Sequence, residues 1–180
     1  MKNEVEIIKK VNDPKYKLIF KKVFRDLYLL NNLFLKQKEK VSYYYENLNT
    51  GLILSYNPNI TFYAASTIKI LVCIYLYEQS INNPKILEEK IEFTPDVKKL
   101  GSDIMQNMVI GSFHKVKDLI KYAITVSDNS AYKMLMNYVG IETIKKYGYS
   151  LGATTTMEGK DHFGIVNATD YVIYFKKLLA

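Results

Sequence analysis

The sequence predicts an α+β fold in which helices pack on a small antiparallel sheet. Three observations support this prediction: a helical apolar pattern before residue 40, a hairpin pattern between residues 41 and 56, and helical patterns alone from residue 67 onward. The chain has 180 residues, 48% of them hydrophobic, which is enough for one globular domain with a real core. We expect an N-terminal helical segment over residues 1–40 and one main domain over residues 41–180.

The N-terminal helix is expected to begin at Asn12-Asp13-Pro14. Asp is a favoured cap, and proline fits the first helical position because its missing N–H would have no partner there. Apolar residues then recur at three- and four-residue steps and give the helix one apolar face. They are Phe20, Val23, Phe24, Leu27, Leu30 and Phe34.

A β-hairpin is predicted next, because Val41–Tyr45 and Leu52–Tyr56 are rich in strand-forming residues and Asn47–Gly51 between them favours a turn. Two strands alone do not form a stable sheet in water. The hairpin therefore needs further strands or a helix against it.

The rest of the chain is predicted to be helical, apart from residues 84–112, which favour no single element. One helix is expected from Thr67 to about Tyr77, closed by Asn82-Asn83-Pro84. Another polar interruption, Ser127-Asp128-Asn129, divides two helical patterns. The later elements are expected at Val116–Val126, Ala131–Tyr138, Ile141–Tyr147 ending at Gly148, a loop over Leu151–Asn167, and a final helix over Ala168–Leu179.

The composition argues against several classes of protein. The chain carries 25 Lys+Arg and 18 Asp+Glu, a formal charge of +7, but no run of five or six like charges, so we expect a solvated basic surface and no nucleic-acid partner. Cys73 is the single cysteine, and His114 and His162 are isolated, so the sequence predicts no internal disulfide, no metal site and no cofactor.

No membrane segment is expected either. The most apolar run, Ile70–Tyr77, has eight residues, whereas a transmembrane helix needs roughly twenty. The N-terminus alternates charged and apolar residues and does not resemble a signal peptide, so a cytoplasmic location is the default expectation. The oligomeric state is left open.

Ser66-Thr67-Ile68-Lys69 is the first candidate for chemistry, because it places a hydroxyl and an amine one helical turn apart on one face. A serine becomes a good nucleophile when a neighbouring base takes its proton, and a lysine with a lowered pKa can be that base. The same spacing also occurs at Ser112 to Lys115 and at Ser130 to Lys133. Only the Ser66 segment follows a predicted hairpin and opens a strongly apolar helix.

Ser127-Asp128-Asn129 is the second candidate, although these residue types are also common in caps and turns. Together, the two motifs resemble those of the class A β-lactamases and related D,D-peptidases. The resemblance includes Phe62–Cys73, Ala123–Ala131 and the preceding hairpin, and it extends from about residue 41 to residue 180. It implies a three-layer α/β/α fold of the β-lactamase type.

The resemblance also implies a role for each site residue. Ser66 would be acylated by a β-lactam or a D-alanyl peptide and then released by hydrolysis, and its backbone N–H would form half of an oxyanion hole. Lys69 would be its base or hydrogen-bond partner, and Ser127 would pass a proton to the leaving nitrogen. Asn129 would bind the acylamide side chain of the substrate, and Asp128 would hold the joint between the helices.

Two features depart from the family pattern. No Lys-Thr-Gly or Lys-Ser-Gly follows residue 129, so the resemblance implies a C-terminally incomplete domain whose last strands are missing and whose sheet keeps an unpaired edge. The loop over residues 151–167 contains one glutamate, Glu158, which is a candidate general base for deacylation or simply an exposed loop acid.

The leading hypothesis is thus a serine hydrolase resembling class A β-lactamases, acting on a β-lactam or a peptidoglycan peptide. Its relatives usually work outside the cytoplasm. The alternatives are a catalytically inactive or fragmentary penicillin-binding-type protein, and a small basic module that binds an acidic partner through its N-terminal helix.

Overall fold

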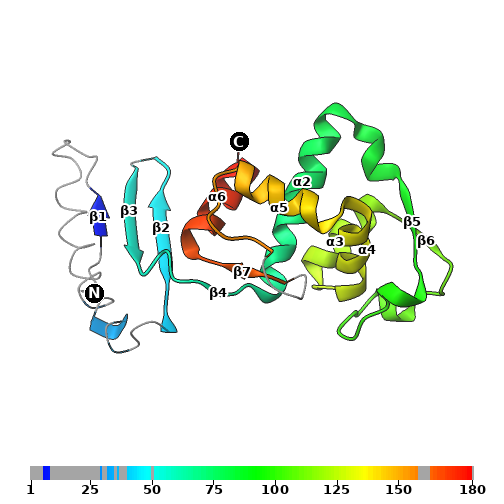
Figure 1. The fold of residues 1–180 in the computed structure, drawn as a ribbon, viewed down its shortest axis with the longest axis horizontal. Helices are drawn as coiled ribbons and strands as arrows, with labels where there is room; N and C mark the ends of the chain where they lie inside the picture. Colours follow the sequence, from blue (N-terminus) through cyan, green and yellow to red (C-terminus); the bar gives the residue numbers. More distant parts are fainter. Residues whose placement is uncertain are drawn as a thin grey trace. The chain divides into compact units, whose positions relative to one another are not determined.

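The computed structural model describes residues 6–8, 29, 32–34, 36, 40–49, 51–157 and 163–179 (Figure 1). The chain divides into two compact units. The first is Met1–Thr61 with Asn167–Val172, and the second is Phe62–Val166 with Ile173–Ala180. Of the predicted N-terminal helix, residues 29 and 32–34 are helical, and the remainder lies outside the described residues. The proposed boundary at residue 40 stays a prediction.

The first unit contains a three-stranded antiparallel sheet with the strand order β1-β3-β2. The predicted hairpin is confirmed as β2 (Tyr43–Asn47) and β3 (Leu52–Tyr56), joined by a turn in which Gly51 has φ +67° and donates to the Asn47 carbonyl at 2.7 Å. β1 (Glu6–Ile8) pairs with β3 on its other side. Sequence reasoning missed β1, because three residues are too few to show a strand's alternation.

Aromatic rings cover one face of this sheet. Phe34 lies 5.1 Å from Tyr43 and 5.9 Å from Tyr56, measured between ring centroids, and the Tyr56 hydroxyl donates to the Phe34 carbonyl at 3.4 Å. Tyr56 is fully buried. Of the six residues predicted to form the apolar face, Phe34 packs on the hairpin, and the other five lie outside the described residues.

The second unit is a helical cluster around α2 (Lys69–Asn82), which contacts three later helices (Figure 1). These are α3 (Val116–Thr125), α4 (Asn129–Val139) and α5 (Ile141–Ser150). The inner face of α2 is buried at positions 71, 72 and 76, as its apolar pattern predicted. The final helix, α6 (Ala168–Leu179), is also confirmed, and its first residues belong to the first unit.

Several helix boundaries differ from the prediction: α2 continues to Asn82, past the predicted end near Tyr77, and α4 begins at Asn129, before the predicted Ala131. A 3-10 turn, η3 (Ala65–Ile68), precedes α2, so the α-helix starts at Lys69 and not at Thr67. The prediction that α5 ends at Gly148 is wrong, because Gly148 allows close packing inside the helix: a Cβ there would lie 3.3 Å from Leu71 Cδ2 of α2 and 3.1 Å from Thr156 Oγ1. The chain leaves the helix at Gly152, which has φ +98°.

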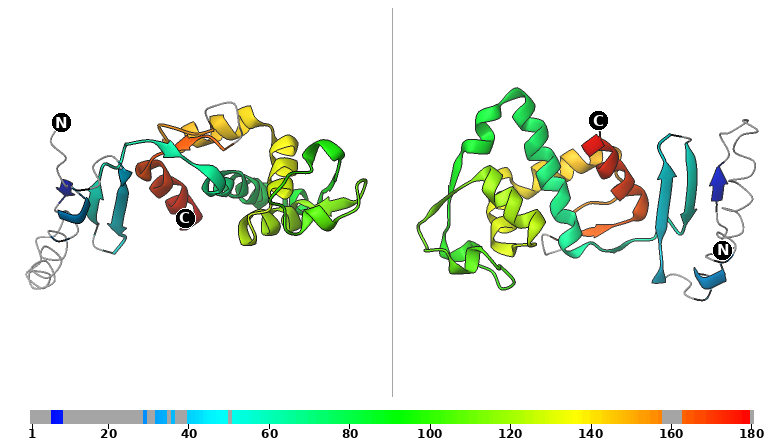
Figure 2. Two further views of the ribbon diagram at one scale, coloured as in Figure 1. Left: turned by 90° about the horizontal axis from the view of Figure 1, so that it is seen from below. Right: turned by 180° about the vertical axis from the view of Figure 1, so that it is seen from behind.

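Short elements complete the second unit. β4 (Phe62–Tyr63) pairs with β7 (Ile165–Val166), and β5 (Lys90–Glu92) pairs with β6 (Phe113–Lys115), both antiparallel. The views of Figure 2 show the β5–β6 ladder beside α3 and α4. The 3-10 turns in the segment without a prediction are η4 (Pro84–Glu88), η5 (Pro95–Val97) and η6 (Met105–Asn107).

The predicted α+β class is confirmed, with helices and small antiparallel sheets. In the described part of the chain, no helix has the length and apolar character needed to cross a bilayer.

Candidate active site

A strained turn presents Ser66 to solvent. The Ala64 N–H donates to the Gly164 carbonyl at 3.1 Å and ties the turn to the strand pair beside it. Ala65 then has φ +48°, a left-handed conformation that costs a non-glycine residue on the order of 1–3 kcal/mol. Ser66 follows in η3 and is exposed, so a ligand can reach its hydroxyl.

Lys69 lies at the start of α2 and is only 1% exposed. Its Nζ donates to the Ser127 carbonyl at 2.6 Å, to Ser127 Oγ at 3.1 Å and to Asn129 Oδ1 at 2.8 Å. An ammonium group has three N–H donors, and these oxygens satisfy all of them. Within the described residues, no hydrogen bond joins Lys69 to Ser66. The buried lysine instead links α2 to the joint between α3 and α4.

Burial lowers the pKa of Lys69 below its ordinary value of 10.5, and the negative charge of Asp128 offsets part of this effect. The lowered pKa makes the neutral amine available at lower pH, as a general base requires. Cys73 does not compete as a nucleophile, because burial raises the pKa of its thiol to about 12 and leaves it 5% exposed.

Asp128 holds the joint beside Lys69, as expected. It is fully buried and caps α4, with Oδ1 accepting from the Ala131 N–H at 2.9 Å. Its Oδ2 accepts from the N–H groups of Ile104 (3.1 Å) and Met105 (2.9 Å). Ser127, which precedes it, is exposed and has φ +55°. The Asp128 carboxylate thus fixes the joint that carries Ser127 and connects it to the start of η6.

Asn129 connects Lys69 to a loop that sequence reasoning did not select. Its Oδ1 accepts from Lys69, and its Nδ2 donates to the Leu100 carbonyl at 2.9 Å. Gly101 follows with φ +72°, and a Cβ at this position would lie 2.9 Å from Asn129 Nδ2. Glycine is therefore required by both conformation and space. In the sequence, this glycine is indistinguishable from an ordinary turn residue.

The other two Ser-x-x-Lys segments have different surroundings. Ser130 is fully buried, accepts from the Lys99 N–H at 2.8 Å and shares a 2.8 Å hydrogen bond with Ser102 Oγ. Ser112 Oγ lies 2.8 Å from His114 Nε2, next to β6. Neither serine is both exposed and close to a buried amine.

Two of the residues considered from sequence, Glu158 and His162, lie outside the described residues. The role of Glu158 as a general base stays a prediction. Among the described residues, no group of three or more His, Cys, Asp or Glu side chains is placed to hold a metal ion.

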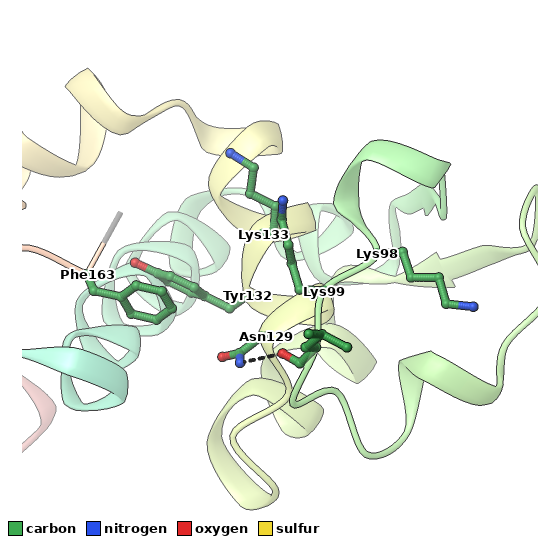
Figure 3. A pocket seen from close by; sticks show the side chains of 7 residues that line it. Lys98, Lys99, Asn129, Tyr132, Lys133 and Phe163 are labelled. Carbon is green, nitrogen blue, oxygen red and sulfur yellow. Dashed lines mark hydrogen bonds between the residues drawn. The ribbon is translucent and has the colours of Figure 1, made fainter. Parts of the chain in front are cut away.

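A pocket of about 590 Å³ opens beside Asn129 (Figure 3). The rings of Tyr132 and Phe163 form one wall, with centroids 5.7 Å apart. The Lys69 ammonium lies 5.6 Å from the Tyr132 ring centroid, so the pocket adjoins the buried lysine. The lining residues are Lys98, Lys99, Leu100, Asn129, Tyr132, Lys133 and Phe163.

Comparison with known proteins gives a consistent result. The model of the beta-lactamase enzyme family matches residues 29–176. No curated protein matches the chain. A β-lactamase from Burkholderia phymatum is 21% identical with a TM-score of 0.71; the match covers 77% of this chain and 56% of the β-lactamase.

Two further solved structures are similar. A β-lactamase from Sphaerobacter thermophilus DSM 20745 is 25% identical, with a TM-score of 0.65, 72% of this chain covered and 52% of the other. A variant of PBP-A, solved as an acyl-enzyme complex with penicillin G, is 21% identical, with a TM-score of 0.67 and coverages of 73% and 52%. The chain thus spans about half the length of these proteins.

Proposed function

We propose that this chain, which belongs to the beta-lactamase enzyme family, carries the nucleophile of a serine hydrolase that is acylated at Ser66. The observation that carries the proposal is the buried Lys69 ammonium, whose three acceptors lie on Ser127 and Asn129. The two motifs predicted from sequence are therefore joined by direct hydrogen bonds. The exposed Ser66 lies one turn away on the same segment.

Acylation begins when Ser66 Oγ attacks the carbonyl carbon of an amide. For this step Lys69 must first release a proton, which its lowered pKa favours. The neutral amine then has a lone pair and donates one hydrogen bond fewer, so it can take the Ser66 hydroxyl proton. The new Oγ–C bond forms as this proton moves to Nζ. The backbone N–H of Ser66 donates to the carbonyl oxygen while it carries negative charge.

Collapse of the tetrahedral intermediate breaks the C–N bond, and the leaving nitrogen needs a proton. Ser127 Oγ supplies it and recovers a proton from the Lys69 ammonium, to which it is hydrogen-bonded at 3.1 Å. Lys69 returns to the neutral state and Ser66 remains as an ester. Water then hydrolyses the ester, releases the carboxylic acid and restores the serine. Glu158 is the candidate base for this last step.

The substrate class we propose is a β-lactam or a D-alanyl peptide. The acyl-enzyme of the similar PBP-A variant with penicillin G supports the β-lactam. In this chain, the pocket beside Asn129 gives the acylamide substituent of either substrate a place next to the Lys69 network.

Covalent labelling with a fluorescent penicillin tests the proposal. We expect the unmodified chain to be labelled, with the adduct located on Ser66 by peptide mass spectrometry. Ser66→Ala should lose the label, whereas Ser112→Ala and Ser130→Ala should keep it. No labelling of the unmodified chain, or equal labelling of Ser66→Ala, would contradict the proposal.

A further inference from the structure

The pocket beside Asn129 has a charge that the acylation chemistry does not require. Among the described residues that line it, three are lysines and none is acidic. Lys98 and Lys99 are exposed and Lys133 is half-buried. Because the cations stand at a cavity and not on a flat surface, a bound anion would be partly shielded from water.

Two of these lysines act together. Figure 3 shows the Lys99 and Lys133 side chains directed to the same end of the pocket, whereas Lys98 points away from Tyr132. The pKa of Lys133 is lowered, first by burial and next by the charge of Lys99, with Asp96 acting in the opposite direction. Lys99 therefore acts on Lys133 as a neighbouring like charge, and both line the same pocket. A carboxylate bound at this end of the pocket would lie near both ammonium groups.

The remaining walls of the pocket suit the rest of an acyl substituent. The Phe163 ring, which lies beside the almost fully buried Tyr132, offers an apolar surface for a flat or aromatic group. Asn129 contributes an amide whose Oδ1 and Nδ2 can each form a further hydrogen bond besides those with Lys69 and Leu100. An amide, an apolar group and an anion can thus be bound side by side.

We propose that this pocket selects substrates whose acyl substituent carries a carboxylate, which Lys99 and Lys133 bind together. The identification of the ligand as an acyl substituent rests on the proposed function. Binding of the carboxylate does not, because it requires neither Ser66 nor Lys69. The preference can therefore be measured separately from acylation.

The test uses a matched pair of small amides, phenylacetamide and the monoamide of phenylmalonic acid, which differ by one carboxylate. Their binding to the full chain is followed by NMR titration at low ionic strength. We expect the carboxylated amide to bind at least about fivefold more tightly, as one or two partly exposed ion pairs allow. Added salt should reduce this ratio, because the attraction is electrostatic.

Lysine variants show which charges are responsible. Lys99→Gln and Lys133→Gln should each reduce the preference, and the double variant should bind the two amides about equally. Lys98→Gln is the matched control, because it changes the net charge by the same amount but removes a side chain that points away. A preference that survives in the double variant, or falls equally in Lys98→Gln, would overturn the proposal.

Acylation experiments distinguish failure of this inference from failure of the proposed function. Benzylpenicillin and carboxybenzylpenicillin differ by the same carboxylate, and the second should label Ser66 faster by a ratio similar to that of the amides. Ser66→Ala should keep the amide preference while losing all label. If no penicillin labels the chain but the amide preference depends on Lys99 and Lys133, the proposed function fails and the carboxylate site stands. If Ser66 is labelled but the chain shows no amide preference, the proposed function stands and the carboxylate site fails.

Discussion

Ser66 in η3 and Lys69 at the start of α2 have the same spacing as Ser130 and Lys133 at the start of α4, but their burial is reversed. Ser66 is exposed and Lys69 is 1% exposed, whereas Ser130 is fully buried and Lys133 reaches the rim of the pocket. The first pair therefore offers a reachable hydroxyl near an amine with three oxygen acceptors. The second offers a structural hydroxyl and a half-buried cation that lines the pocket.

This difference in burial is information that the Ser-x-x-Lys pattern alone does not contain. A nucleophile must be accessible to substrate, and its base must be desolvated to lower the pKa of the amine. Whether the serine is exposed and whether the lysine is buried decides both conditions. The Ser130 hydroxyl instead accepts from the Lys99 N–H and shares a hydrogen bond with Ser102 Oγ. These two bonds hold the loop in front of the pocket.

The largest effect is expected for the amine of the first pair. Lys69→Gln should lower the rate constant for acylation by a fluorescent penicillin by about 10²- to 10⁴-fold, because it removes the general base. Lys115→Gln is the control, since Lys115 pairs with Glu88 on the surface outside the site. Stopped-flow labelling measures both variants. Equal rates for Lys69→Gln and the unmodified chain would remove the functional distinction between the two pairs.

The pH dependence of acylation sharpens the role of Lys69. Its pKa is lowered from 10.5 by burial, so the neutral amine accumulates as pH rises toward a value below 10.5. We expect the acylation rate to fall about tenfold for each pH unit below this pKa and to level off above it. Lys69→Gln should abolish the dependence. A rate that falls as pH rises through the same range would mean that Lys69 acts as a charged donor.

Replacing Ser130 should destabilise the fold more than replacing Ser66, whereas the loss of labelling is expected for Ser66. Ser130→Ala leaves the Lys99 N–H and the buried Ser102 Oγ with one partner fewer and should lower the free energy of unfolding by about 1–3 kcal/mol. Ser66→Ala removes an exposed hydroxyl and should change it by less than about 0.5 kcal/mol. Urea denaturation followed by circular dichroism measures both. Similar losses in the two variants would mean that Ser66 is also structural.

The third serine provides the smallest expected effect. Ser112 is half-buried and its hydrogen bond to His114 lies in the β5–β6 region, so Ser112→Ala should cost no more than about 1 kcal/mol. Its labelling rate should be unchanged. The same denaturation and labelling assays apply. A loss of labelling in the folded Ser112→Ala variant would place a second functional serine in the chain.

Much of the fold followed from local patterns. The hairpin, α3, α4 and α6 were predicted near their observed positions, because alternation, periodicity and caps such as Asp128 are written in neighbouring residues. The end of α5 was not, since Gly148 serves contact with Thr156 and not helix termination. β1 and the β5–β6 ladder depend on pairing between distant segments, which local periodicity does not report.

For the site, the sequence by itself determined the chemical types: a serine and a lysine one turn apart, and a second serine with an asparagine in a polar joint. The tertiary structure alone decided that Lys69 is buried, that its three protons meet Ser127 and Asn129, and that Lys99 and Lys133 share one pocket. The physical reason is that desolvation and charge proximity depend on which segments pack together. Sequence context already favoured Ser66 over the two serines that share its pattern, and packing then showed that it is the exposed one of the three.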